Sequence, residues 1–337
     1  MSKEESYNIG WAFLRIWMGF EIVLTHYWIN KTNAFWIFDK TTTFAVPVFM
    51  LLSFILNGNT IMLCDKKKVQ RRLYRLFLPY VFWACAYWLF YVFLSKILDF
   101  GEIYGVSDLL WQLLLGHRQS MNPPMWFQAD LIILFILFIG IFYVCKKGAM
   151  GVLIILLFAS IVLQYSGINY TIFSGCRFEV SYPLGRLNEM IPYACLGILL
   201  CKYNLLNIIR NKKFLILFIP ILICLLRFSV FFLPDGFGYQ GIYYILVSVM
   251  LILIFYLLPF ESLPDFMRNG IIFISKYSMG VYCMHFLVGR ALNSFIFPRA
   301  GIETNTLAGC VLIYIICWFA AFVIAKIPFK WCEAIVS

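Results

Sequence analysis

Two ionisable residues share the first long apolar segment of the chain. Arg15 and His26 both lie within residues 9–29, with ten residues between them. Eleven steps of 100° come to three turns plus roughly 20°, so a helix holds both side chains on one face, roughly 16 Å apart along its axis. Ionisable groups inside a membrane are costly and mostly face the protein interior or a water-filled cavity. We interpret this face as the wall of a reaction chamber.

The side chains suit proton transfer and the binding of an anion. Histidine has an unperturbed pKa of about 6.5, so it can accept a proton near neutral pH. The planar fork of arginine binds two phosphate oxygens at once. Arg72 and Arg75 open the third apolar segment and are three residues apart, so they lie on one face of a helix. These residues predict a polyanionic donor held at the cytoplasmic mouth and an imidazole deeper along the same route.

The composition indicates an integral membrane protein. Of the 337 residues, 63% are hydrophobic and 13% are charged, whereas a soluble chain has about a quarter charged. The net charge of +11 is distributed between apolar segments, mostly in alternate loops, which is typical of membrane topology and not of nucleic-acid binding. The eleven cysteines form no CxxC pair and no Cys/His cluster with zinc spacing. We therefore expect no metal site and no nucleic-acid partner.

Apolar runs of spanning length predict a single all-α, polytopic membrane domain over residues 1–337. The fifth run is short, and the sixth and ninth are interrupted by polar residues. Residues 107–116 also form an apolar stretch, with Ser107 as its expected N-cap, but it is too short to span. The ten predicted spans are about 9–29, 43–63, 75–95, 126–145, 149–165, 186–203, 214–233, 240–260, 271–296 and 304–325.

The basic residues set the expected orientation. The largest cluster falls at residues 66–75, and others lie at 146–147 and 202–213. All fall on one side if the spans alternate, so the positive-inside rule places both termini in the cytoplasm. Several polar side chains are then expected in the outer half of the membrane: His26, Trp126, Asp130, Arg186, Glu189, Arg227 and His285. Five of them could meet in one cavity: His26, Asp130, Glu189, Arg227 and His285.

Structural roles for these residues stay open as alternatives. His285 also fits a histidine bonded to a neighbouring helix. Arg186 and Glu189, three residues apart, fit a simple helix pair, and Asp130 with Arg227 would make a buried ion pair. The basic run at 66–75 also fits a topology determinant that binds anionic lipid heads. Glu21, about 140° around the helix from His26, is a poor candidate for orienting its imidazole.

Five stretches, in order, resemble the acyltransferase 3 family of membrane-bound O-acyltransferases. They are LRIWMGFEIVLTH (14–26), FAVPVFMLLSFIL (44–56), RRLYRLFLPYVFW (71–83), PPMWFQADLIIL (123–134) and ISKYSMGVYCMHFLV (274–288). The resemblance implies a ten-helix core in the inner membrane of a bacterium. It also implies transfer of an acyl group, usually acetyl from acetyl-CoA, to an envelope glycan or its lipid-linked precursor. His26 would be the catalytic base, Arg15 its companion, and Arg72 and Arg75 would serve the acyl-CoA donor or the integrity of its site.

Two other functions are compatible with the same pattern. Helices with polar groups at mid-depth also describe a secondary transporter or a flippase for a glycan or other anionic solute. A non-enzymatic assembly factor would leave the face carrying Arg15 and His26 unexplained. No histidine is followed five residues later by aspartate, which argues against a glycerolipid acyltransferase. The sequence sets no oligomeric state.

Overall fold

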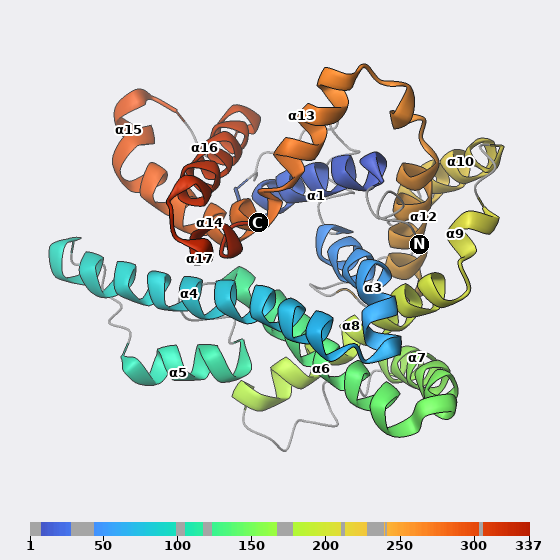
Figure 1. Cartoon of the computed structure of the whole chain (residues 1–337). Coiled ribbons are helices and arrows are strands. Elements are labelled where there is room, and N and C mark those ends of the chain that lie inside the picture. The colour runs from blue at the N-terminus through green and yellow to red at the C-terminus, as the bar shows by residue number, and fades with distance from the viewer. Residues whose placement is uncertain are drawn as a thin grey trace.

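The part of the chain that the structure describes is built of helices, without strands (Figure 1). The structure is a computed structural model that describes residues 8–27, 44–98, 105–116, 123–166, 178–209, 213–227, 239, 241–302 and 306–337. The helices are α1 (Ile9–Tyr27), α3 (Ala45–Leu63), α4 (Lys66–Leu98), α5 (Val106–Leu115), α6 (Trp126–Cys145), α7 (Ala149–Tyr165), α8 (Phe178–Lys202), α9 (Leu205–Ile208), α10 (Phe214–Arg227), α12 (Ile242–Leu257), α13 (Asp265–Ser275), α14 (Ser278–Ala291), α15 (Phe297–Ala300), α16 (Leu307–Lys326) and α17 (Lys330–Ala334).

Fewer of the described helices are long and apolar enough to cross a membrane than the ten spans that the sequence predicts. Among the described residues, α13 and α14 meet at 55° and count as a sixth span only if taken together. The 14-residue α10 is shorter than the roughly 20 residues that a spanning helix needs. The structure therefore supports a multi-pass membrane protein, but ten spans are not confirmed. The five qualifying stretches are Ala45–Leu63, Lys66–Phe93, Trp126–Tyr165, Ile242–Ser262 and Leu307–Lys326.

Two of the predicted spans, α6 and α7, form one of these stretches. Trp126–Tyr165 is 40 residues long, and at about 1.5 Å per residue it is roughly twice as long as the hydrocarbon core is thick. Lys146, which follows α6, has φ 45° and ψ −112°, far from helical values. The chain therefore leaves helical geometry where the sequence predicts a loop between two spans.

The basic run at 66–75 is helical, so α4 begins nine residues before the predicted third span at 75–95. Asp65 accepts hydrogen bonds at Oδ1 from the backbone N–H groups of Lys67 and Lys68, at 3.1 and 3.2 Å. A carboxylate in this position satisfies free N–H groups and complements the positive end of the helix dipole. Arg72 and Arg75 therefore both lie on α4, about one helical turn apart, as their spacing predicts.

The short α5 also begins before its expected N-cap. It starts at Val106, and Gly105 precedes it with its N–H donated to Asp108 Oδ2 at 2.7 Å. Ser107 is therefore inside the helix. Gly116 ends α5 with φ 58°, a left-handed conformation that glycine adopts without strain.

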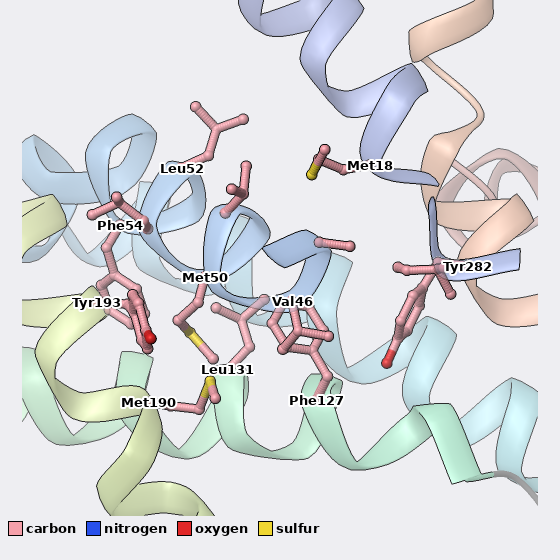
Figure 2. Close-up of a cluster of buried hydrophobic side chains, with 14 of the residues drawn as sticks. Met18, Val46, Met50, Leu52, Phe54, Phe127, Leu131, Met190, Tyr193 and Tyr282 are labelled. Carbon is pink, nitrogen blue, oxygen red and sulfur yellow. The ribbon is translucent and has the colours of Figure 1, made fainter. Parts of the chain in front are cut away.

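Helix α3 packs tightly against α8 in the centre of the bundle. A Cβ atom on Gly197 of α8 would lie 2.7 Å from the carbonyl oxygen of Leu51, so only glycine permits this approach. Figure 2 shows Met50, Leu131 and Met190 converging below α3 from α3, α6 and α8. The contact between α3 and α8 forms the centre of the core. Helix α1 packs against α3 and also touches α12, α13, α14 and α16.

Candidate active site

Helices α1 and α14 lie side by side and run in the same direction. A Cβ atom on Gly19 of α1 would lie 4.0 Å from the Cβ atom of Ser278 on α14. At the positions seven residues further along each helix (19 to 26 and 278 to 285), the rings of His26 and His285 have centroids 5.1 Å apart. Equal spacing on both helices means that they are parallel, so helix packing brings the two imidazoles together.

The stripe of α1 that carries Arg15 and His26 faces neighbouring helices. Because α1 is unbroken, the two side chains keep the relative placement expected from their spacing. Between them on the stripe, a Cβ atom on Gly19 would be in ordinary contact with Tyr314 of α16 and Ser278 of α14. Arg15 is half-buried and His26 is exposed. The imidazole is therefore accessible at the end of a stripe that is otherwise covered by protein.

His285 is completely buried, and its ring orientation is set by α14 itself. Its Nδ1 atom lies 2.7 Å from the carbonyl oxygen of Tyr282. A carbonyl only accepts hydrogen bonds, so we assign the proton to Nδ1, which leaves a lone pair on Nε2. The buried Nε2 atom has no hydrogen-bond partner among the described residues.

The last turn of α1 is fastened to α14 beside these imidazoles. The hydroxyl of Tyr27 donates to the carbonyl oxygen of Phe286 at 3.1 Å. The Tyr27 ring lies so close to Gly289 that a Cβ atom there would overlap it. His26 also has the Phe286 ring edge-on, with centroids 5.9 Å apart. These contacts fix the end of α1 that presents the exposed imidazole.

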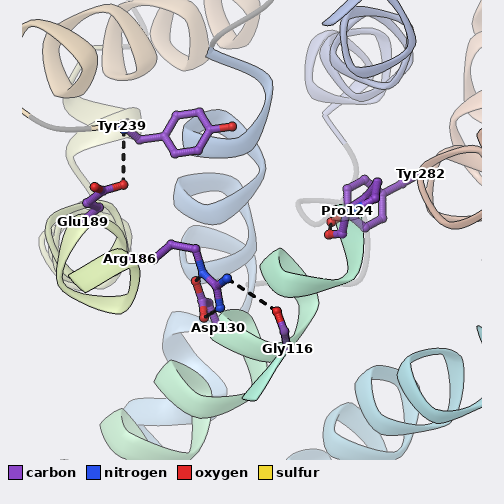
Figure 3. Close-up of polar contacts among 7 residues, drawn as sticks. All are labelled: Gly116, Pro124, Asp130, Arg186, Glu189, Tyr239 and Tyr282. Carbon is purple, nitrogen blue, oxygen red and sulfur yellow. Dashed lines mark hydrogen bonds and ion pairs between the residues drawn. The ribbon is translucent and has the colours of Figure 1, made fainter. Parts of the chain in front are cut away.

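A second polar group joins α6 to α8. Arg186 donates from Nε and Nη2 to the two carboxylate oxygens of Asp130, at 2.8 and 2.9 Å, and both side chains are almost fully buried. Its Nη1 reaches the carbonyl oxygen of Gly116 at 3.4 Å, and its guanidinium carbon lies 4.7 Å from the ring centroid of Trp126. Figure 3 shows the guanidinium between Asp130 and Gly116. Such a two-pronged pair fixes geometry as well as charge.

Two of the partnerships offered as alternatives by the sequence are wrong. Asp130 pairs with Arg186 and not with Arg227, which is exposed at the end of α10. Arg186 does not pair with Glu189, because its guanidinium points to Asp130. Glu189 instead accepts a hydrogen bond from the backbone N–H of Tyr239 at 3.3 Å (Figure 3). Helix spacing alone could not show these partners, since each lies on another segment.

Six of the polar residues expected in the outer half of the membrane form two groups. One holds His26 and His285; the other holds Trp126, Asp130, Arg186 and Glu189. Tyr282 connects the two groups. Its hydroxyl donates to the carbonyl oxygen of Pro124, and its ring meets that of Phe127 edge-on at 5.6 Å. The α14 helix that carries His285 is thus tied to the start of α6.

The basic residues of α4 face the C-terminal end of the chain. Arg75 is exposed, and Arg72 is half-buried with its Nε atom lacking a hydrogen-bond partner among the described residues. Nearby, Lys276 and Glu333 form an ion pair with Nζ and Oε1 2.6 Å apart. The hydrogen bond and charge of Lys276, with a smaller effect of Arg75, hold the pKa of the Glu333 carboxyl below its usual value. Arg72, Arg75 and Lys276 therefore form a positive surface, which we call the basic face.

Sequence reasoning missed several residues of these groups. Tyr27, Tyr239 and Glu333 gave no signal, because their partners are distant in sequence, and Lys276 was visible only as a basic residue of the stretch 274–288. Tyr282 was visible only as part of the stretch 274–288. The described residues contain no group of three or more His, Cys, Asp or Glu side chains placed to hold a metal ion.

Comparison with known proteins gives one match. The family model of acyltransferase 3, described as an acyltransferase domain, matches residues 8–325. No curated protein and no solved structure matches the chain. The matched span includes both polar groups and the basic residues of α4.

Proposed function

The chain belongs to the acyltransferase 3 family, and from this premise we propose that it transfers an acyl group from acetyl-CoA to a hydroxyl of a cell-surface glycan or its lipid-linked precursor. Membership of the family makes the chain a membrane acyltransferase. The donor, the acceptor and the catalytic residues are our proposal. So are ten membrane crossings in a bacterial inner membrane, with both termini in the cytoplasm.

In this reaction His26 is the general base. It takes the proton of the acceptor hydroxyl while that oxygen attacks the thioester carbonyl. When the carbon–sulfur bond breaks, the CoA thiolate takes the proton from the imidazolium, so the products are an ester and free CoA thiol. General-base catalysis contributes about 10²–10⁴ in rate, and the positioning of both substrates adds a further large factor.

One observation carries this proposal above all. The imidazole of His26 is exposed, at the end of a stripe that packs on α14 and α16, and the neighbouring Tyr27 fastens that end to α14. A base must reach its substrate and must also be held in place. Arg15, on the same stripe, supplies positive charge for the donor or for the oxyanion that develops on the thioester.

The basic face suits the phosphates of the donor. Arg72 and Arg75 are one turn apart on α4, and the buried Nε atom of Arg72 can still donate a hydrogen bond. Arginine binds phosphate oxygens in pairs. We therefore expect Arg72→Gln to raise the KM for acetyl-CoA about tenfold, the loss of one charge-assisted hydrogen bond worth about 1.5 kcal/mol, with a smaller change in kcat.

The test uses the purified full chain in lipid nanodiscs, with acetyl-CoA labelled in its acetyl group and a lipid-linked glycan as acceptor. His26→Ala should lower the rate of ester formation at least about 100-fold without changing the melting temperature. Thr25→Ala is the matched control, because the Thr25 hydroxyl is bonded to the Glu21 carbonyl oxygen of its own helix at 2.8 Å. Full activity of His26→Ala would refute the assignment.

The competing function is transport. In proteoliposomes, a secondary transporter or flippase would move an anionic solute or a glycan without any covalent product. Uptake with no acetyl ester, in preparations where His26→Ala behaves like wild type, would support transport and reject acyl transfer.

A further inference from the structure

His285, which lies against the proposed base His26, has a hydrogen-bond acceptor that no described residue uses. Its side chain is completely buried, its Nδ1–H is bonded to the Tyr282 carbonyl oxygen, and its Nε2 has no hydrogen-bond partner among the described residues. Burying an acceptor without a partner costs about 1–3 kcal/mol. Such atoms are uncommon in native proteins and call for an explanation.

Neighbouring helices anchor the turns of α14 that carry His285. Tyr87 of α4 donates to the Cys283 carbonyl oxygen at 2.9 Å and accepts from the Leu287 N–H at 3.0 Å. Tyr282 and Tyr27 fasten the same turns of α14 to Pro124 and to α1. Helix α14 is thus held on three sides around His285, and the Nδ1 bond to Tyr282 orients the ring.

An imidazole that acts as a base needs an acceptor for its second nitrogen. When His26 takes a proton on one nitrogen, the other carries an N–H group, and a partner for that group fixes the ring and stabilises the cation. Glu21 is the carboxylate on the same helix, but it lies about 140° around it. It also accepts a hydrogen bond from Trp17 Nε1 at 2.5 Å. On α14, the ring that lies against His26 is that of His285.

We propose that His285 is a positioning residue, whose Nε2 accepts a hydrogen bond from the N–H of His26 while His26 removes the proton of the acceptor hydroxyl. The inference rests on the proposed function and deepens it. With centroids 5.1 Å apart, rotation of the exposed His26 ring brings two nitrogens to hydrogen-bond distance, about 2.7–3.2 Å. No proton passes to His285. The proton stays on His26 until the CoA thiolate takes it.

Two substitutions separate this role from a structural one. Asparagine can replace the donor at Nδ1 and keep the bond to Tyr282, but it leaves nothing at the position of Nε2. Glutamine is longer and places an acceptor oxygen near Nε2, but it loses the Nδ1 geometry. If His285 acts through Nε2, then His285→Gln should retain activity and His285→Asn should lose it. If the bond to Tyr282 is what matters, the order reverses.

The assay is acetyl transfer in nanodiscs, with kcat and KM measured separately. We expect His285→Asn to lower kcat about tenfold or more and to leave the KM for acetyl-CoA unchanged. The loss in kcat should not exceed the factor of about 10²–10⁴ that general-base catalysis supplies in total. His285→Gln should stay within about threefold of wild type. Equal kcat values for the two variants, or higher activity of the Asn variant, would overturn the inference. Wild-type protein without any acetyl transfer would instead overturn the proposed function, and this inference with it.

A measurement on the wild-type chain covers the case in which a variant does not fold. The chain has 3 histidines, so nitrogen-15 spectra of histidine-labelled protein are simple to assign. With a non-reactive acetyl-CoA analogue and acceptor bound, the His285 Nε2 signal should stay that of a nitrogen without a proton and move upfield as it accepts a hydrogen bond. An unmoved signal would refute the proposal.

Discussion

The ion pair between Arg186 and Asp130 gives the sharpest prediction about stability. Both side chains are almost fully buried, and the guanidinium uses two nitrogens on the carboxylate. Arg186→Met removes the positive partner and keeps most of the apolar volume. The carboxylate of Asp130 then stays buried without its counter-charge, and one further acceptor, the Gly116 carbonyl oxygen, loses its donor.

The expected cost follows from this burial. Removing one partner of a buried pair destabilises a protein by about 3–5 kcal/mol, because the remaining charge is uncompensated. Loss of the contact with Trp126 adds about 0.5–2 kcal/mol. Removing both charges, in Arg186→Met with Asp130→Leu, avoids the isolated charge. The double variant should therefore be more stable than Arg186→Met alone, by about 2 kcal/mol or more.

Unfolding in mixed micelles with increasing dodecyl sulfate, followed by tryptophan fluorescence, measures these differences. The control is the pair of Arg268 and Asp265 on α13, which is largely exposed. Asp265→Asn should cost less than about 1 kcal/mol. A cost below about 1 kcal/mol for Arg186→Met, or a double variant less stable than both single variants, would refute the argument that burial of an unpaired charge dominates.

Two further predictions concern packing and pH. Gly197→Ala should destabilise the protein by about 1–3 kcal/mol, because the added Cβ atom would overlap the backbone of α3. The control is Gly140→Ala. There is open space around Gly140, so this variant should be as stable as wild type or more stable in the same unfolding assay. A stable Gly197→Ala variant would contradict the close contact of α3 and α8. The pair of Glu333 and Lys276 should stabilise the chain above pH about 4.3, the ordinary glutamate pKa, and lose this effect as the pH falls through the lowered pKa of Glu333. The stabilities of wild type and Glu333→Gln, from unfolding curves measured between pH 3 and 7, should therefore differ only at the upper end of this range. The difference there should be less than about 1 kcal/mol. A difference that is larger at low pH than at pH 7 would contradict the predicted direction of the pH dependence.

Helix positions were largely predictable, because they depend on local sequence. The runs 126–145 and 149–165 match α6 and α7 to the residue, and 43–63 differs from α3 by two residues at its start. The differences lie at the starts of helices, and α8 begins at Phe178, eight residues before the predicted sixth span. Asp65 begins α4 ahead of the basic run, and Gly105 precedes α5. Part of the predicted seventh span, residues 228–233, lies outside the described residues.

In the candidate site too, features within one helix were predictable and contacts between helices were not. Arg15, His26, Arg72 and Arg75 were identified from spacing within single helices, and a continuous α1 and α4 preserve that spacing. Partners between helices were not predictable, since they depend on which faces meet. The sequence offered an ion pair of Asp130 with Arg227 as one alternative, whereas the packing of α6 on α8 places Asp130 against Arg186.

The sequence by itself determined the class of protein, the apolar segments and the face that joins Arg15 to His26, because hydropathy and helical period are properties of neighbouring residues. Only the tertiary structure decided that α1 and α14 run parallel with Gly19 beside Ser278, and hence that the imidazole of His26 lies against that of His285. The reason is physical. In the membrane, close packing and buried hydrogen bonds between helices select the neighbours, and those terms depend on residues more than two hundred positions apart.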